Sequence, residues 1–562
     1  MRNIYRLLLV LLSLTTPAQA QDATVPLNPD VYRVIDRYHI KHNTETLHTS
    51  FKPYGRARVA TLGETAKQES MSQGSAADEY NINYLLNDNW NYTRNDRDNE
   101  NQRPLLRHFY TNKTDLYHYE SPEFTLRVNP VIGLQAGKDN ETDGLRYINS
   151  RGLQVEGSLD EKLGFYTFLS DNQVKLPGYV NNRIARDTIV PHEAYWKTFG
   201  KGGYDFFSAR GYINYAATKH ISVMLGHDRH FIGNGFRSLI LSDYSAPYFF
   251  LKLQTQVWKL QYTNLYAELT ADHEQRDQLY PKKYMALHHL SLNILPNLNV
   301  GVFESTIFGR SKGRFELQYL NPLIFYRAVE QGLGSEDNAI LGADAKWNIL
   351  NRVQLYGQLV LDEFLISELR AGNGWWANKY ALQGGARYID AFGVSNLDLQ
   401  GEINYVRPFT YSHEQPYTNY QHYQQPLAHP MGANVAEAIS IIRYQPLPKL
   451  TVTAKAIVSQ YGQDPEDTFD SEGNRTRYNF GGNVLKSYNT RSGDYGYEVG
   501  SGIKTNQVYG EATASFQLMY NMFLDVTQVV RRAEASDPRF DQKTSFSAIS
   551  FRWNIPQRTH EF

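Results

Sequence analysis

The feature that most limits how this chain can fold is an alternation of apolar and polar residues, which continues from about residue 105 to the end of the sequence. In one example the apolar residues are Leu450, Val452, Ala454, Ala456 and Val458. The residues between them are Thr451, Thr453, Lys455, Ile457 and Ser459. Successive side chains of a strand point to opposite faces, so the pattern predicts β-strands with one apolar and one wet face. It recurs in 124–136, 511–518 and 548–555.

The connections between these stretches also alternate, in length. Short turns are expected within 294–300, 349–355, 446–452 and 518–524, and long polar loops within 411–433 and 463–500. Short turns at one end and long loops at the other are typical of a bacterial outer-membrane β-barrel. A soluble β-sandwich also alternates, but it rarely does so over about 450 residues with one loop-rich end. At about 10 residues per strand plus connections, about 14 to 18 strands fit, in even number.

Composition agrees with an all-β transmembrane antiparallel barrel. The chain has 41 tyrosines and 13% aromatic residues, yet its mean hydropathy is −0.53 because lipid-facing and lumen-facing residues cancel. With 57 Lys and Arg against 58 Asp and Glu, no net field would attract nucleic acid. Beyond the first twenty residues no apolar run reaches the roughly 18 residues that a membrane-spanning helix needs.

The first twenty residues predict a secretory signal peptide. Arg2 and Arg6 precede the apolar run 7–14, and Ala18 and Ala20 form a small-residue cleavage site. No cysteine occurs in the chain, which excludes lipidation at cysteine, disulfides and thiolate metal sites. The expected location is the outer membrane of a Gram-negative cell.

Residues 21–104 predict a small periplasmic helical subdomain and a linker, ahead of a barrel over 105–562. Asn28, Pro29 and Asp30 form a helix start, so a helix is expected from Pro29 to about His42. Ser75, with an acid three residues later, starts a second helix that ends near residue 87. The polar stretch 87–103 has no periodicity and is interpreted as a linker or loop.

The stretch 231–250, FIGNGFRSLILSDYSAPYFF, contains Gly233 and Gly235 but lacks the remaining residues of a dinucleotide or phosphate-binding motif. It is expected to be a bent loop between strands at 221–225 and 249–257. Its glycines would permit a positive φ or a close backbone approach.

Three stretches resemble the Wzi-type capsule assembly family: GHDRHFIGNGFRSLILSD, QYLNPLIFYRAVEQGLGSEDNAILGADAKW and YGQLVLDEF. PLNPDVYRVIDRYHIKH and HTSFKPYGRARVA look in particular like its gliding motility branch, RemB of Bacteroidetes. The resemblance covers most of the mature chain. It implies an 18-stranded barrel, a periplasmic helical bundle, and a role in holding or organising surface polysaccharide, in adhesion or gliding. The implied partners are outer-membrane lipid, surface polysaccharide and other cell-envelope proteins.

Polar residues of these stretches are candidates for a charge network in the lumen: Arg237, Asp243, Arg327, Asp337, Asn338, Asp344 and Asp362. Either they pair across strands to seal the barrel, or some of them bind sugar. Arg237 lies beside an apolar wall and needs a carboxylate, for which Asp243 and Asp344 are the candidates.

Aromatic residues of the predicted loops are further candidates for sugar binding, because ring faces suit sugar C–H groups: Trp375, Trp376, Tyr411, Tyr417, Tyr420 and Tyr423. An aromatic girdle at the membrane interface would explain many of them equally well.

Nothing in the sequence indicates an enzyme, a metal or a cofactor. His227 and His230 have no third ligand nearby, and His288 and His289 should lie on opposite faces of a strand. Asp362 and Glu363 should likewise point apart, which argues against a paired-carboxylate site. The sequence therefore favours a non-enzymatic barrel that binds or helps assemble surface polysaccharide. The alternative is a passive, porin-like channel.

Overall fold

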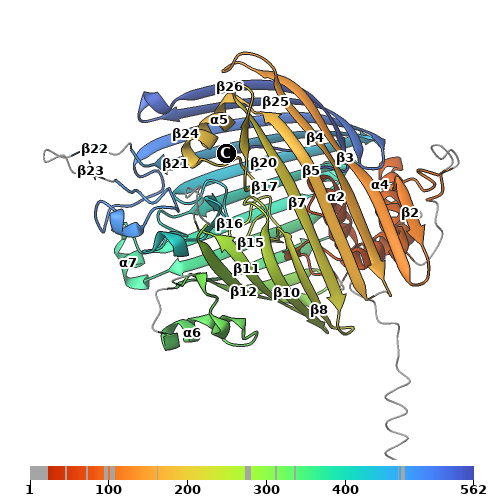
Figure 1. Cartoon of the computed structure of the whole chain (residues 1–562), viewed down its shortest axis with the longest axis horizontal. Helices are drawn as coiled ribbons and strands as arrows, with labels where there is room; N and C mark the ends of the chain where they lie inside the picture. Colours follow the sequence, from red (N-terminus) through yellow and green to blue (C-terminus); the bar gives the residue numbers. More distant parts are fainter. Residues whose placement is uncertain are drawn as a thin grey trace, which may run out of the picture.

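A computed structural model describes residues 23–44, 47–70, 74–93, 99–101, 108–160, 162–271, 280–310, 313–333, 337–465, 468–469, 475–476 and 478–562. Within these residues the chain forms a closed antiparallel β-barrel of eighteen strands, as predicted (Figure 1). The predicted signal peptide lies outside the described residues. None of the helices in the described part is long and apolar enough to span a membrane.

The wall begins with β3, which pairs with its sequence neighbour β4 and with the last strand, β26, so that the ring closes. The wall strands are β3 (Phe124–Asp139), β4 (Arg146–Leu159), β5 (Leu163–Lys175), β7 (Gly203–Ala216), β8 (Ile221–Asp228), β10 (Tyr248–Val257), β11 (Leu260–Thr270), β12 (Lys282–Leu295), β13 (Leu298–Phe308), β14 (Asn338–Ile349), β15 (Val353–Glu363), β16 (Lys379–Tyr388), β17 (Leu397–Val406), β20 (Val435–Leu447), β21 (Leu450–Gln463), β24 (Ile503–Met519), β25 (Met522–Ala535) and β26 (Gln542–Trp553).

Short strands accompany this wall: β2 (Tyr117–Glu120) pairs only with β3, and β6 (Lys197–Phe199) only with β7. Three two-residue pairs lie in loops: β1 (Phe51–Lys52) with β9 (Phe231–Ile232), β18 (Gln421–His422) with β19 (Gln425–Pro426), and β22 (Thr468–Phe469) with β23 (Arg475–Thr476).

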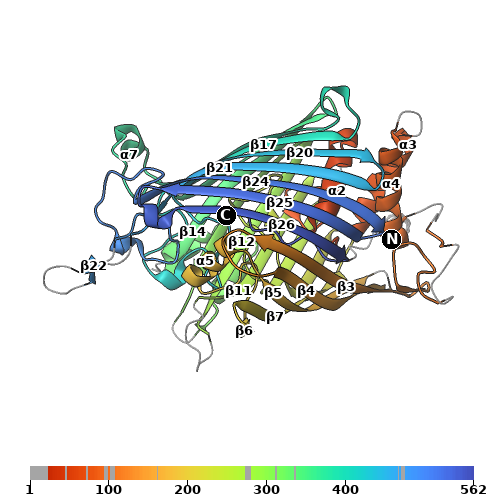
Figure 2. The same ribbon diagram turned by 90° about the horizontal axis from the view of Figure 1, so that it is seen from above.

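The two ends of the barrel differ as predicted. The expected short turns join β12 to β13, β14 to β15, β20 to β21 and β24 to β25 at one end, here called the short-turn end. Long connections, including those after β17 and β21, gather at the opposite, long-loop end (Figure 2). The predicted faces are also observed. Val452 and Val458 are exposed on the outside, whereas Lys455 and Ser459 are buried on the inside.

Three helices close the short-turn end: α2 (Pro29–His42), α3 (Arg56–Ser70) and α4 (Ala76–Asp88) (Figure 2). α2 is capped by Asn28, and α4 by a reciprocal Ser75–Asp78 capping box, as the sequence predicted. α3 was not predicted. The expected linker contains a packed 3-10 turn, η1 (Trp90–Tyr92), whose Trp90 is buried. The predicted boundary at residue 105 falls outside the described residues.

The helices are fixed to the wall by ion pairs. Arg37 of α2 contacts Asp390 and Asp398 in the β16–β17 turn region, and Arg552 of β26 contacts Asp30 at 2.7 Å. Val34, Ile35 and Tyr38 of α2 pack with residues of α3 and α4 in one apolar cluster. The helical segment is therefore built into the end of the barrel.

The lumen is filled on one side by an apolar core. It contains Phe51 of β1, Leu239–Leu241 of the 229–247 loop, and Tyr411 and Tyr420 of the 407–434 loop. These pack on inward residues of the wall, among them Leu265, Met285, Leu287, Phe303 and Ile340. Loops from the barrel wall thus fold inward and meet the N-terminal segment inside the lumen.

Residues 554–562 also turn back into the lumen. The expected alternation ends at Trp553, because Asn554 adopts a left-handed conformation with φ of 54°. Ile555 then packs against the lumen core instead of continuing the outer face. Further on, Phe562 packs against α5 (Gly178–Asp187), and the C label lies beside α5 in Figures 1 and 2.

The remaining elements lie between strands: η3 (Leu317–Leu320), α6 (Tyr326–Leu333), α7 (Ile366–Ala371), η4 (Ala391–Gly393), η5 (Pro416–Thr418), η6 (Tyr488–Thr490) and η7 (Pro538–Phe540). Residues 313–333, which include η3 and α6, lie against the outer face of β11–β13 and are called the outer flap. In Figure 1 α6 lies outside the ring of strands, below β12.

Candidate functional site

The 229–247 segment is a bent loop, as the sequence predicted, and it enters the lumen. Gly233 has a φ of 121°, and a Cβ there would lie 2.1 Å from the side-chain amide of Gln358. A Cβ on Gly235 would lie 2.7 Å from the main-chain oxygen of Arg237 and from Glu402. One glycine thus supplies the positive φ, and both supply a close approach that other residues would block.

Arg237 is buried in the lumen and pairs with two carboxylates. Its Nε donates to Glu437 Oε1 at 3.1 Å, and its Nη1 lies 3.6 Å from Glu561 Oε2. Burial alone would lower the pKa of Arg237, but the two carboxylates outweigh burial and raise it. The predicted partners Asp243 and Asp344 are wrong, because the bent loop turns the guanidinium toward β20 and the 554–562 segment.

Glu402 and Glu437 anchor the same loop. Glu402 accepts the main-chain N–H groups of Phe236 and Arg237 at 2.6 and 3.0 Å. Glu437 Oε1 also forms a hydrogen bond with His429 Nε2, at 2.8 Å. Neither glutamate was predicted as a site residue, although both occupy inward positions of alternating strands. This cluster fixes the lumen contents to the wall.

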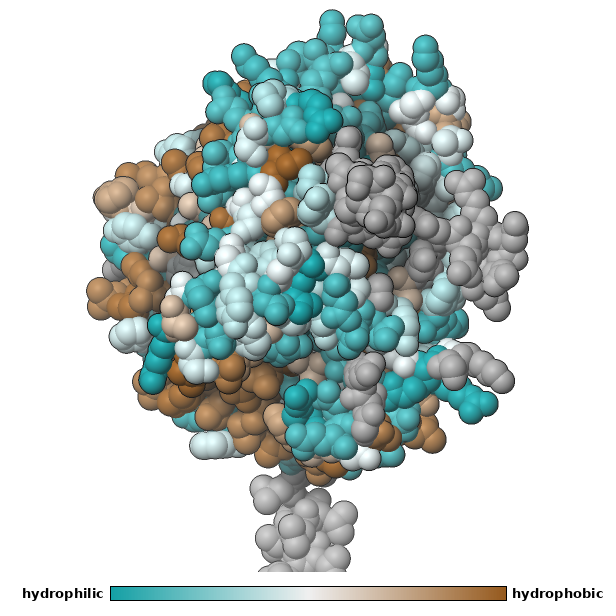
Figure 3. Space-filling view, turned by 90° about the vertical axis from the view of Figure 1, so that its left-hand side faces the viewer, coloured by the Kyte–Doolittle hydropathy of each residue, from teal (hydrophilic) through white to brown (hydrophobic). Residues whose placement is uncertain are grey.

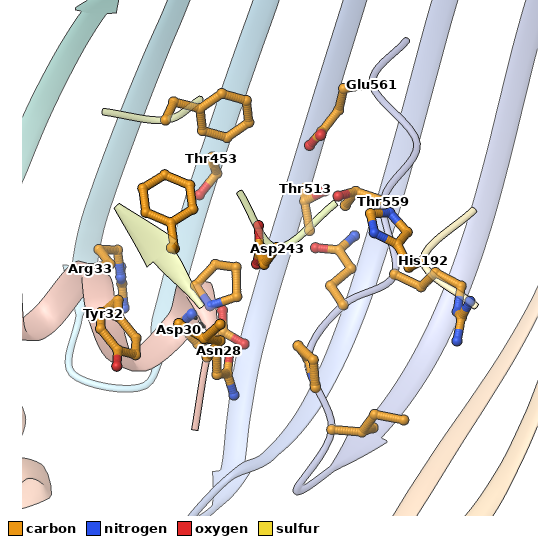
Figure 4. A pocket seen from close by; sticks show the side chains of 18 of the residues that line it. Asn28, Asp30, Tyr32, Arg33, His192, Asp243, Thr453, Thr513, Thr559 and Glu561 are labelled. Atoms are coloured by element: carbon orange, nitrogen blue, oxygen red, sulfur yellow. Dashed lines mark hydrogen bonds between the residues drawn. The ribbon is translucent and has the colours of Figure 1, made fainter. Parts of the chain in front are cut away.

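A chamber of about 440 Å³ remains on the other side of the lumen. Figure 4 shows the N-terminal end of α2, with Asp30, Tyr32 and Arg33, on one side of it. The 554–562 segment, with Thr559 and Glu561, lies on the other, and Thr453 and Thr513 project from the wall. Hydroxyl groups, aromatic rings and charged groups therefore face one space.

The chamber is lined by more Arg and Lys side chains than Asp and Glu side chains. Among the described residues, no carboxylate lies within 4.0 Å of the side-chain nitrogens of Arg33, Lys52 or Arg443. Lys52 is only 6% exposed and lies 5.4 and 4.8 Å from the ring centres of Tyr32 and Phe231. Burial lowers the pKa of both Lys52 and Arg33. The chamber can therefore accommodate an anionic or hydroxyl-rich group.

The other predicted charged residues occupy separate places. Asp344 is buried in the lumen against His289 Nε2 at 2.7 Å. Asp243 lies on the chamber wall, and its main-chain oxygen accepts from Arg229. Asn338 donates to the main-chain oxygen of Thr418 at 3.1 Å.

Two of the predicted residues belong to the outer flap and its base. Asp337 contacts Arg310 Nη1 at 2.7 Å and accepts from Tyr319 Oη at 2.7 Å. Arg327 is exposed and pairs with Glu330 on α6. Neither residue shares a contact with Arg237, so the seven residues do not form one network.

Asp362 and Glu363 do not point apart as predicted. Both carboxylates lie 3.1 Å from the Nζ atom of buried Lys379. The pairing of β15 with β16 shifts register between Leu361 and Glu363, and this irregularity turns successive side chains toward the same cation. His288 and His289 behave as predicted: His289 faces the lumen, and His288 lies on the outer face beside Glu304.

The aromatic candidates divide by exposure. Tyr411 and Tyr420 are each 1% exposed in the lumen core, so they stabilise the 407–434 loop. Tyr417 is exposed, and Tyr423 is half-buried beside Tyr280 and His422. Trp375 and Trp376 are half-buried at the long-loop end.

Trp375 and Trp376 belong to an aromatic platform, here defined as Trp375, Trp376, Tyr488, Arg491 and Tyr495. Main-chain hydrogen bonds join 373–376 to 494–497: Trp376 N–H donates to Asp494 O at 2.9 Å, and Gly496 N–H to Asn373 O at 2.9 Å. The Trp376 ring lies 4.7 Å from that of Tyr488 and carries the Arg491 guanidinium at 4.1 Å. Tyr495 is 57% exposed.

The platform combines the exposed ring of Tyr495 with three half-buried rings, and polar groups lie beside them. Arg491 is held by Asp494 at 2.7 Å, and Asn373 donates to Glu368 at 2.9 Å. Tyr488, Arg491 and Tyr495 were not predicted, because the loop 463–500 has no periodicity from which a partner for Trp376 could be inferred. Figure 3 shows the surrounding long-loop end as mostly hydrophilic, with apolar atoms gathered toward its margin.

The described residues contain no group of three or more His, Asp or Glu that could hold a metal ion. His230 is buried between Phe250 and Tyr248, and burial lowers its pKa well below the usual value.

These features define a class of protein: an outer-membrane β-barrel with a partly filled lumen, helices across one end and loops with exposed aromatic groups at the other. Among solved structures, the chain is similar to Wzi of Escherichia coli, an outer-membrane protein involved in group 1 capsule assembly and described as a carbohydrate-binding β-barrel. The match covers 95% of this chain and 100% of that one, with a TM-score of 0.57 and 12% identity. At this identity the likeness concerns the fold alone.

Other solved barrels match less of the chain. OprD of Pseudomonas aeruginosa matches 76% of this chain and 94% of its own, with a TM-score of 0.41 and 10% identity. OccAB2 of Acinetobacter baumannii matches 76% and 97%, with a TM-score of 0.42 and 8% identity. No family model and no curated protein sequence matches the chain.

Proposed function

We propose that this protein is a non-enzymatic outer-membrane barrel that binds surface polysaccharide and helps to hold or assemble it at the cell surface. The observation that carries the proposal is the aromatic platform at the long-loop end, above a lumen partly filled by packed segments. In bacterial barrels the long loops face the exterior and the short turns face the periplasm. The platform would therefore meet polymer outside the cell.

The chemistry of the platform suits a sugar polymer. Exposed ring faces stack on sugar C–H groups, and the neighbouring Asn373, Arg491 and Asp494 offer donors and acceptors to hydroxyls. The hydrogen-bonded ladder between 373–376 and 494–497 holds Trp375 and Tyr495 on adjacent loops. The fold shared with Wzi supports the same role. The narrower resemblance to the RemB branch, and with it adhesion or gliding, remains a prediction.

The test is polysaccharide binding by purified protein and polymer retention by cells that carry platform variants. We expect Trp375→Ala and Tyr495→Ala to lower retention per folded molecule. Trp258→Ala is the matched control, because Trp258 is 77% exposed at the short turn after β10. Equal retention in all three variants would contradict a role for the platform.

The alternative is a passive channel. Measuring the conductance of the purified barrel in a planar bilayer distinguishes a channel from a polysaccharide-binding barrel. The apolar core that fills one side of the lumen and the helices that close the short-turn end predict no steady large conductance. A stable open-pore conductance in the unmodified protein would favour the channel.

A further inference from the structure

The outer flap, residues 313–333, lies against a face of the barrel that would otherwise meet lipid. The wall residues beneath it alternate with residues of the lumen core. On β12, Met285 and Leu287 belong to that core, so Tyr284, Ala286 and His288 point outward. On β13, Phe303 and Ile307 point inward, so Glu304 and Phe308 point outward. The flap therefore covers the outside of β11–β13.

The flap descends along this wall by a series of hydrogen bonds. Near the long-loop end, Tyr284 Oη donates to the main-chain oxygen of Gly313 at 2.8 Å. Further down, Tyr266 Oη donates to Leu320 O at 3.0 Å. At the tip, Tyr262 Oη donates to Pro322 O at 2.5 Å, and Asn264 Nδ2 donates to the same oxygen at 3.2 Å.

This contact is deep on the wall. Tyr262 lies two residues after Leu260, where β11 begins at the short-turn end. The tip of the flap has therefore passed most of the length of β11. In the register of the wall, Tyr262 is opposite Leu290, and Leu290 is opposite Val302. Leu290 and Val302 are exposed apolar residues of the kind that faces lipid.

At such a depth the main-chain groups of an irregular segment need hydrogen-bond partners, because an unpaired group costs several kcal/mol in hydrocarbon. Here the wall supplies the partners. Besides the bonds to Gly313, Leu320 and Pro322, Glu304 accepts Tyr326 N–H at 2.9 Å. The other carboxylate oxygen of Glu304 lies 3.1 Å from His288 Nδ1. Polar side chains on the outer wall are thus matched to main-chain groups of the flap.

The opposite surface of the flap is mainly apolar between residues 317 and 325, although Gln318 and Asn321 are also exposed there. Leu317 is 73% and Leu323 85% exposed, and Leu320, Ile324 and Phe325 are exposed beside them. The charged pair Arg327–Glu330 lies on α6, which leads from the tip back toward β14, with its charges 2.7 Å apart. The exposed apolar residues therefore continue the apolar surface of Leu290 and Val302.

We propose that the outer flap is embedded in the membrane and that its exposed edge, Leu317 to Phe325, is a binding surface for lipid acyl chains. The occupant is lipid because the edge is continuous with the lipid-facing wall, and because main-chain groups of the flap are hydrogen-bonded to the barrel. This assignment does not depend on polysaccharide binding.

The absence of cysteine from the sequence makes a direct test possible, because each single-cysteine variant carries one label. We would attach a spin label at Leu323→Cys and Leu317→Cys in the full-length barrel, reconstituted in phosphatidylcholine bilayers. Collision with molecular oxygen, which concentrates in the hydrocarbon layer, is compared with collision with a water-soluble nickel chelate. Val452→Cys reports the lipid-facing wall, and Tyr495→Cys reports the water-exposed loops.

We expect both flap labels to show high oxygen and low nickel collision, as at Val452→Cys. A nickel collision rate like that at Tyr495→Cys would place the flap in water and overturn the proposal. Low collision with both reagents would place the edge against protein, such as a second copy, and would also overturn it. If Leu317→Cys does not fold, Leu323→Cys alone decides, since Leu323 is the more exposed of the two side chains, at 85%.

Discussion

Arg237→Ala should destabilise the barrel without removing polysaccharide binding. The guanidinium makes three contacts with oxygen atoms in the lumen: Nε with Glu437 Oε1 at 3.1 Å, Nη2 with Glu561 O at 2.7 Å, and Nη1 with Glu561 Oε2 at 3.6 Å. Removing one partner of a buried ion pair costs about 3–5 kcal/mol, because the other charge stays buried.

The expected loss is at the lower end of that range, about 3 kcal/mol. Glu437 keeps His429 Nε2 at 2.8 Å and Asn404 Nδ2 at 3.0 Å, and Glu561 keeps Lys455. Both carboxylates thus retain a donor after the substitution, which limits the cost.

The assay is equilibrium unfolding by guanidinium in detergent micelles, followed by the gel mobility of the folded barrel. Arg532→Ala is the control, because Arg532 is 66% exposed beside Glu534 and such pairs contribute less than about 1 kcal/mol. Equal unfolding free energies for the two variants would refute the structural role of Arg237. A stable Arg237→Ala barrel that no longer binds polysaccharide would place the binding site in the lumen.

Three further predictions concern the wall, the loops and Asp115, a buried residue between η1 and β2. Val452→Arg should impair folding by about 2–4 kcal/mol, whereas Thr453→Arg, which faces the lumen chamber, should cost less; equal yields of folded barrel would contradict the assigned faces. An epitope tag within 478–500 should be reached by antibody on intact cells and one at Pro448–Lys449 should not; the reverse pattern would invert the barrel. Burial raises the pKa of Asp115, but Arg127 and donors such as Trp90 outweigh it and hold the pKa at about 2. Since the pKa of an unfolded Asp is about 3.9, the stabilisation from this carboxylate is present above about pH 4 and is lost as the pH falls toward 2. Asp115→Asn should therefore reduce the change of the unfolding free energy with pH over that window. An unchanged pH profile would contradict this expectation.

The wall could be predicted from the sequence because alternation reports directly on a surface with two different sides. Val452 and Thr453 were assigned to the correct faces for that reason. The caps of α2 and α4 were found because Asn28 and the Ser75–Asp78 pair satisfy main-chain N–H groups locally. α3 begins without such a cap and was missed.

The contents of the lumen could not be predicted, because no periodicity identifies which loop turns inward. Tyr411 and Tyr420 look like exposed loop aromatics in the sequence, yet they are buried between distant segments. Arg237 received the wrong partners for the same reason: Glu437 and Glu561 lie 200 and 324 residues away in sequence. A local register shift, invisible in the pattern, brought Asp362 and Glu363 together on Lys379.

The contact between Arg552 and Asp30 has a consequence for assembly. The two residues are separated by 522 positions, and all eighteen described wall strands lie between Asp30 and the end of β26. Contacts of such long separation form late, because the entropy of closing the intervening chain must first be offset by other pairings. α2 is synthesised early, but its ion pair with β26 can form only after the last strand has joined the barrel. Formation of the Arg552–Asp30 pair therefore coincides with closure of the ring.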